Sequence, residues 1–223
     1  MEKILIIVDI QRGFIRTPEA EDTLKNIDSL ISTGAFDKVI ATVYENYENS
    51  PISRLMGWKD LMTQQEQQLL GKAAQCDYAV HKNTYSAVND QMLQVLREIG
   101  KGELPPCVYV VGVDTECCVL ATATDLFELG IRPIVMSQYC GSSCGLNYHQ
   151  AGLLSLVNLV GRCNIWDGRV ESAQDLEQAL SEAIRGSMAG NAQQPAPEQQ
   201  LVERLMEKTG IYPLRNPAPA VWL

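Results

Sequence analysis

Short runs of aliphatic and β-branched residues alternate with segments of helical period along most of this 223-residue chain. Runs of this length that are bounded by turn residues are typical of strands buried on both faces. Regular alternation of such strands with helices predicts repeated βαβ units and a parallel sheet. The expected strands cover residues 3–9, 38–44, 77–81, 107–113, 132–137 and 163–167.

The segments between these strands repeat apolar residues at helical spacing. In residues 20–32, for example, Leu24, Ile27 and Ile31 fall on one face. Glycines follow two of the segments where a helix would stop. The expected helices cover residues 20–32, 86–99, 117–129, 147–160 and 172–184. We therefore predict an α/β protein, a doubly wound three-layer sandwich with a six-stranded, mainly parallel sheet.

The character of the sequence changes after Arg185. Residues 186–200 are rich in Ala, Gln, Pro and Gly, which is typical of a linker, and the proline-broken end of the chain carries apolar anchors such as Trp222. We expect one domain over residues 1–185 and a C-terminal linker and arm over residues 186–223. The sequence leaves open whether this arm packs on a subunit or is a disordered tail.

The charge balance excludes several classes of partner. The chain has 18 Lys and Arg against 27 Asp and Glu, a net charge of -9, which disfavours binding to nucleic acid. No apolar run approaches the roughly 18 residues of a membrane span, and the run that ends at Asp9 is too short for a signal peptide. We expect a cytoplasmic protein that acts on a small molecule and binds neither nucleic acid nor membrane.

The metal-binding residue types are not spaced for a metal site. The 7 cysteines include no CxxC pair, and the 2 histidines are His81 and His149. We therefore expect free thiols, no metal and no other cofactor. By strand alternation His81 should point away from the face that Lys82 occupies, and His149 should cap or pack a helix.

Three residues with reactive side chains lie where expected strands end. Asp9 ends the first strand, Lys82 follows the third, and Cys118 opens the helix after the fourth. Side chains past the carboxyl ends of parallel strands line the crevice of such a sheet. Each residue also has an ordinary explanation. Asp9 could be a turn residue, Lys82 a solvated loop lysine, and Cys118 a small buried apolar residue.

Cys118 carries the more specific signal of the three. A thiol in the first helical turn faces unpaired N–H groups and the positive end of the helix dipole, and both favour the thiolate. Its neighbour Cys117 points about 100° away around the helix, so at most one of the two faces a given crevice. At the level of local sequence, a nucleophile and a structural cysteine both remain open.

Three motifs stand at these positions in the order IVDIQ (residues 7–11), KNTYSA (residues 82–87) and GVDTECCVLATA (residues 112–123). They resemble the first-strand aspartate motif, the lysine motif and the nucleophile motif of the isochorismatase-like cysteine hydrolases. This family includes nicotinamidases and N-carbamoylsarcosine amidase. The resemblance extends to about residue 185, and its register selects Cys118 over Cys117.

The resemblance implies a catalytic triad of Asp9, Lys82 and Cys118. In such a triad the lysine lowers the thiol pKa, and the aspartate carries the thiol proton to the departing nitrogen. The resemblance also implies a cis peptide bond between Val113 and Asp114, with an oxyanion hole formed by the N–H groups of Asp114 and Cys118. Related proteins are commonly homo-oligomers, and we expect the same here.

The chain departs from the family pattern in two places. Metal-binding nicotinamidases of the family carry histidines after the second strand, whereas residues 42–51 contain none. We expect Tyr44 and Asn46 to bind substrate there, and Glu45 and Glu48 to belong to a solvated loop and not to a metal site. Residues 137–145 replace a usual Asp-Ala pair, which alters the expected pocket shape.

Isochorismatase itself lacks the nucleophilic cysteine, so the thiol favours cleavage of a C–N bond. The leading hypothesis is a cysteine-dependent amidohydrolase that cleaves a small amide, ureido or carbamoyl compound through a thioester. One alternative is a non-catalytic binding or assembly protein that uses the C-terminal arm. A less favoured alternative is a redox-sensing thiol protein, because adjacent cysteines such as Cys117 and Cys118 form a strained ring when bridged.

Overall fold

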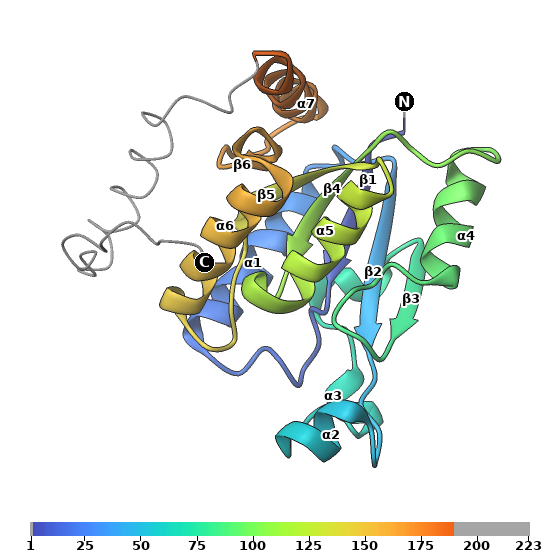
Figure 1. The fold of residues 1–223 in the computed structure, drawn as a ribbon, viewed down its shortest axis with the longest axis vertical. Coiled ribbons are helices and arrows are strands. Elements are labelled where there is room, and N and C mark those ends of the chain that lie inside the picture. The colour runs from blue at the N-terminus through green and yellow to red at the C-terminus, as the bar shows by residue number, and fades with distance from the viewer. Residues whose placement is uncertain (1, 190–223) are drawn as a thin grey trace, which may run out of the picture. The chain divides into compact units, whose positions relative to one another are not determined.

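The computed structural model describes residues 2–189 (Figure 1). Six strands form one sheet in the order β3-β2-β1-β4-β5-β6, and every neighbouring pair is parallel. The strands are β1 (Ile4–Val8), β2 (Lys38–Tyr44), β3 (Tyr78–Lys82), β4 (Cys107–Gly112), β5 (Arg132–Cys140) and β6 (Ile165–Trp166). The sheet confirms the predicted α/β class. Strand order reverses between β1 and β4, the position at which such sheets open a crevice.

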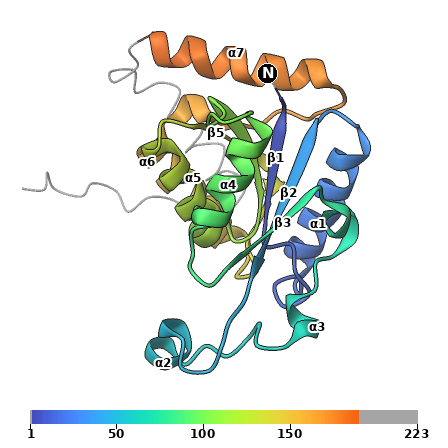
Figure 2. The same cartoon turned by 90° about the vertical axis from the view of Figure 1, so that its right-hand side faces the viewer.

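Helices cover both faces of the sheet, as expected for a three-layer sandwich (Figure 2). Side chains of α4, α5 and α6 pack on one face, and those of α1 and α7 pack on the other. The helices are α1 (Pro18–Ser32), α2 (Pro51–Met56), α3 (Gln64–Gln67), α4 (Asp90–Ile99), α5 (Leu120–Glu128), α6 (Leu146–Val160) and α7 (Ala173–Met188). None of the helices within this described range is long and apolar enough to cross a bilayer.

Strand β1 explains why its sequence is apolar without interruption. All five residues are buried, and they alternate between the two cores. Leu5 and Ile7 pack against the α1 and α7 side, whereas Ile4, Ile6 and Val8 pack against the other side. A strand covered on both faces needs an apolar residue at every position, so β1 is anchored on both sides up to the residue before Asp9.

Several element boundaries differ from those expected. Strand β5 reaches Cys140 instead of residue 137, and α7 reaches Met188, past the expected domain boundary at residue 185. Helices α2 and α3 were not predicted, because they are short and have no buried residues to produce a helical apolar period. Residues 190–223 of the linker and arm expected over residues 186–223 lie outside the described residues.

Gly112 allows β1 and β4 to approach closely at the end of both strands. Its φ is 124°, and a Cβ atom there would overlap the backbone nitrogen and carbonyl oxygen of Val8. We expect Gly112→Ala to lower the free energy of unfolding by about 3 kcal/mol, since it adds a backbone clash to a strained φ. Urea denaturation measures this loss.

Gly34→Ala provides the matched control for this prediction. Gly34 also has a positive φ, 65°, but a Cβ atom added there would meet no other atom within 4 Å. Backbone strain alone should lower the free energy of unfolding of this variant by about 1 kcal/mol. Equal losses in the two variants would show that close strand approach is not the reason for Gly112.

Candidate active site

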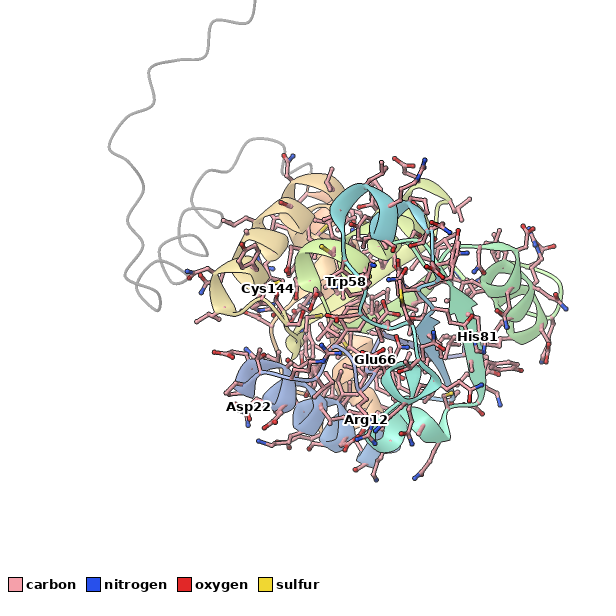
Figure 3. The ribbon with its side chains drawn as sticks, turned by 90° about the horizontal axis from the view of Figure 1, so that it is seen from below. Arg12, Asp22, Trp58, Glu66, His81 and Cys144 are labelled. Atoms are coloured by element: carbon pink, nitrogen blue, oxygen red, sulfur yellow. The ribbon has the colours of Figure 1, made fainter. Side chains whose placement is uncertain are left out.

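The predicted reactive residues meet at the carboxyl ends of the central strands. Asp9 directly follows β1, Lys82 ends β3, and Cys118 lies in the turn that follows β4. Figure 3 looks onto this end of the molecule, where the loops after β2 and β5 bring Trp58 and Cys144. The topology therefore gathers side chains from distant parts of the chain at one edge of the sheet.

Asp9 and Lys82 form a fully buried ion pair. Lys82 Nζ lies 2.7 Å from Asp9 Oδ2, and both side chains have 0% exposure. Lys82 Nζ also donates to the carbonyl oxygens of Thr84 at 3.1 Å and Tyr85 at 3.0 Å, while Asp9 Oδ1 accepts the Thr42 hydroxyl at 2.5 Å. These hydrogen bonds offset part of the cost of removing two charges from water.

The lysine of this pair remains a cation. Burial lowers the pKa of Lys82, but interactions with the Asp9 carboxylate and with Cys118 outweigh burial and raise it above its ordinary value. Oδ1 of Asp9 is held by Thr42, and Oδ2 accepts no hydrogen bond from the other described residues apart from its ion pair. Oδ2 is therefore the oxygen available to receive a proton.

Cys118 lies beside both charges in a π-helical turn, Thr115–Val119, that leads into α5. Cys118 is 4% exposed, and both Asp9 and Lys82 act on the pKa of its thiol. Burial, and then the Asp9 carboxylate, raise the pKa of the Cys118 thiol well above its ordinary value, although Lys82 lowers it. Lys82 thus acts in the expected direction, but desolvation and the nearby carboxylate exceed the effect of one cation, so the net change is upward.

An aromatic cluster borders the lysine. Lys82 Nζ lies 4.8 Å from the ring centroid of Tyr44. The Tyr44 ring meets Trp58 at 5.9 Å and Phe14 at 6.4 Å, and the Phe14 and Trp58 rings stack at 6.1 Å. Burial raises the pKa of Tyr44 to about 12, so its hydroxyl stays neutral. Phe14 was not predicted, although an aromatic residue in the loop after the first strand was an available signal.

Asn46 has a different role from the expected one. Its amide donates to the carbonyl oxygens of Trp58 at 3.3 Å and Asp60 at 2.9 Å, and its Oδ1 accepts from Tyr47 N and Ser50 Oγ. These four hydrogen bonds use every polar position of the amide. Asn46 therefore closes the base of the loop between β2 and α3, and no hydrogen-bonding group remains for a substrate.

The turn that carries Cys118 begins with an unusual peptide bond. The bond between Val113 and Asp114 is cis, as the family resemblance implied. Within residues 2–189, the N–H of Asp114 donates no hydrogen bond. An unpaired donor next to the thiol is what an oxyanion hole requires. The assignment of Asp114 and Cys118 N–H groups to that hole stays a prediction.

The two histidines lie outside the group formed by Asp9, Lys82 and Cys118. His81 is exposed, and its Nδ1 lies 2.7 Å from Glu45 Oε1. The Nδ1 of His149 lies 2.7 Å from Thr115 Oγ1, and burial lowers the pKa of this histidine to about 4. A neutral, packed His149 fits the expected structural role. No group of three or more potential metal-ligating side chains occurs in the part of the chain that the structure describes.

Comparison with known proteins identifies relatives with matching sequence and fold. Residues 3–164 match the family model described as the Isochorismatase domain. The chain is 31% identical over 163 residues to Nicotinamidase 3 of Arabidopsis thaliana, a match that covers 68% of this chain and 79% of that protein.

Two solved structures share the fold at lower identity. An isochorismatase-like hydrolase from Alkaliphilus metalliredigens superposes with a TM-score of 0.64 at 17% identity, covering 81% of this chain and 100% of that chain. N-carbamoylsarcosine amidase from Thermoplasma acidophilum gives a TM-score of 0.61 at 21% identity, covering 76% of this chain and 96% of that chain. Given the family match and the sequence relative, the chain belongs to the isochorismatase family of hydrolases.

Proposed function

We propose that the protein hydrolyses the C–N bond of a small amide, ureido or carbamoyl compound through a thioester on Cys118. The observation that carries this proposal is the buried arrangement of Asp9, Lys82 and Cys118, in which both charged groups act on the thiol. A fully desolvated ion pair is costly for stability alone, and such sites are where proton-transfer chemistry is concentrated.

The first half of the reaction follows from these charges. The thiol proton moves to Asp9 as the sulfur attacks the carbonyl carbon, and Lys82 stabilises the anionic sulfur. The oxyanion that forms is received by the N–H groups of Asp114 and Cys118. Protonated Asp9 then gives its proton to the departing nitrogen, the C–N bond breaks, and the acyl group remains on Cys118.

The second half repeats these steps with water. Asp9 removes a proton from water as the hydroxide attacks the thioester carbonyl. The C–S bond breaks, the acid product leaves, and the proton on Asp9 returns to the sulfur of Cys118. A raised thiol pKa suits this cycle, because the resting nucleophile stays protonated until a substrate occupies the site.

The surroundings of the triad support an uncharged or flat acyl group. Tyr44 presents its ring beside Lys82, and Phe14 and Trp58 pack around Tyr44. Such rings bind apolar and planar groups through their faces and edges. Nicotinamidase 3 and N-carbamoylsarcosine amidase are named for two C–N compounds of the proposed class.

Ammonia release tests the proposal directly. We expect turnover of at least one of nicotinamide and N-carbamoylsarcosine with a kcat of about 1 per second or more. Because residues 42–51 contain no histidine, we also expect the rate to survive dialysis against EDTA. Loss of activity after dialysis, with recovery on adding zinc, would contradict the metal-independent mechanism. A thioester adduct on Cys118, found by mass spectrometry of quenched reactions, identifies the intermediate.

A further inference from the structure

The nucleophile turn is defined here as Asp114 together with the π-helical turn Thr115–Val119. Its first three residues bind the loop that follows β5. Ser143 binds the carboxylate of Asp114, the N and Oγ1 atoms of Thr115 each donate to Gly141 O at 2.9 Å, and Ser142 Oγ donates to Glu116 Oε1 at 2.7 Å. This loop belongs to residues 137–145, the segment expected from the sequence to alter the pocket. It supplies the partners of the turn that carries Cys118.

The pairing of Asp114 with Ser143 uses both oxygens of the carboxylate. Ser143 N donates to Oδ1 at 2.6 Å, and Ser143 Oγ donates to Oδ2 at 2.8 Å. Asp114 is 8% exposed, so its charge is largely removed from water. Two short charge-assisted hydrogen bonds to a single residue determine both the position and the orientation of the side chain.

The opposite side of the same turn is confined by α6. A Cβ atom at Gly152 would lie 2.5 Å from Glu116 N, so the helix backbone packs directly on the turn. The turn is held by α6 at Glu116 and by the β5–α6 loop at Asp114. Both supports therefore hold the start of the Thr115–Val119 turn that carries Cys118.

We propose that the Asp114 carboxylate is a positioning residue, which holds the nucleophile turn on Ser143 so that the Asp114 N–H stays aimed at the oxyanion. This inference rests on the proposed function. Donors of an oxyanion hole act only when they are fixed before the charge develops, and small displacements lower the rate steeply. Because a negative charge near the oxyanion is unfavourable, the contribution of this carboxylate is geometric and not electrostatic.

Three variants separate the geometric contribution of the Asp114 side chain from the contribution of its charge. Asp114→Ala removes both hydrogen bonds to Ser143. Asp114→Asn keeps both, because its amide oxygen accepts from Ser143 N and its amide nitrogen donates to Ser143 Oγ. Asp175→Ala is the matched control, since Asp175 accepts from the N and Oγ of Ser172 at the start of α7.

Two thiol reagents distinguish the contribution of the oxyanion hole from the reactivity of the Cys118 thiol itself. With p-nitrophenyl acetate the sulfur attacks the ester carbonyl, the C–S bond forms, p-nitrophenolate leaves and the thiol proton passes to Asp9. That reaction passes through an oxyanion. Iodoacetamide alkylates the same sulfur with loss of iodide and forms no oxyanion. Peptide mass spectrometry assigns each adduct to Cys118 or Cys117.

We expect Asp114→Ala to slow acylation of Cys118 by about 10- to 100-fold without slowing its alkylation. Asp114→Asn should acylate within about threefold of the wild type, and Asp175→Ala should match the wild type in both reactions. Ser143→Ala, which removes only the hydroxyl, should slow acylation by about three- to tenfold and keeps the test decisive if Asp114→Ala folds poorly.

Wild-type acylation in both Asp114→Ala and Ser143→Ala would overturn the inference, as would equal slowing of acylation and alkylation. Slow acylation in Asp114→Asn would assign the effect to charge and would also overturn it. Failure of the proposed function gives a different result, in which Cys118→Ala releases p-nitrophenolate as fast as the wild type.

Discussion

Cys118→Ala is expected to abolish hydrolysis, lowering kcat by about 10⁴-fold or more. Without the sulfur no thioester forms, and Asp9 and Lys82 have no nucleophile to assist. Ammonia release measures the loss, and intact-protein mass spectra should show no acyl adduct. The variant should fold normally, since a thiol-to-methyl change leaves only a small cavity.

Cys117→Ala provides the matched control at the adjacent position. The Cys117 thiol is half-buried, and burial together with Glu116 and Asp114 raises its pKa to about 11. Asp9 is not among the groups that shift this pKa and Lys82 is the weakest of them, so kcat should stay within about threefold of the wild type. If Cys117→Ala were inactive and Cys118→Ala active, the motif register and the mechanism built on it would be wrong.

Lys82→Met is expected to lower the free energy of unfolding by about 3–5 kcal/mol and to abolish turnover. The change leaves the Asp9 carboxylate at 0% exposure without its cation. It also removes the donor to the carbonyl oxygens of Thr84 and Tyr85. Urea denaturation measures the loss of stability, and ammonia release measures the loss of activity.

The double variant Asp9→Asn/Lys82→Met separates stability from catalysis. It removes both buried charges, so it should recover about 2 kcal/mol or more relative to Lys82→Met while remaining inactive. Additive losses in this cycle, with no recovery, would contradict the assigned ion pair. Recovery of activity together with stability would show that the pair supports the fold and not the reaction.

The same two residues should move the titration of the thiol in opposite directions. Asp9 raises the pKa of Cys118 and Lys82 lowers it. In the Asp9→Asn variant, alkylation of Cys118 by iodoacetamide should therefore reach half its maximal rate at a lower pH than in the wild type. In the Lys82→Met variant it should do so at a higher pH. Shifts of the opposite sign would disprove the assigned charges.

Local sequence identified those features that depend on neighbouring residues. The apolar residues of β1 and the apolar period of α1 are repeated burial patterns, and they predicted the layers of the fold. Helices α2 and α3 escaped prediction because Ser50 and Thr63 cap them without any buried apolar face. Hydrogen bonds made by a capping side chain leave only a weak trace in sequence.

The candidate site depended far more on distant contacts. Local sequence left Cys118 open between a nucleophile and a buried structural residue, and only the motif resemblance favoured the first. Asn46 was expected to face a substrate, but carbonyl groups of Trp58 and Asp60 occupy its amide. A side chain with four possible hydrogen-bond partners is assigned by its neighbours in space, and these lie after it in the chain.

The order of strands and helices, the acid, lysine and thiol at their ends, and the family were all present in the amino-acid sequence by itself. Tertiary structure decided the direction in which the pKa of that thiol shifts, the 2.7 Å ion pair of Asp9 and Lys82, and the support of Asp114 by Ser143. The physical reason is the distance along the chain over which each effect acts. Burial periods repeat within a few residues, whereas desolvation and Coulomb energies depend on distances between groups that only the folded chain brings together.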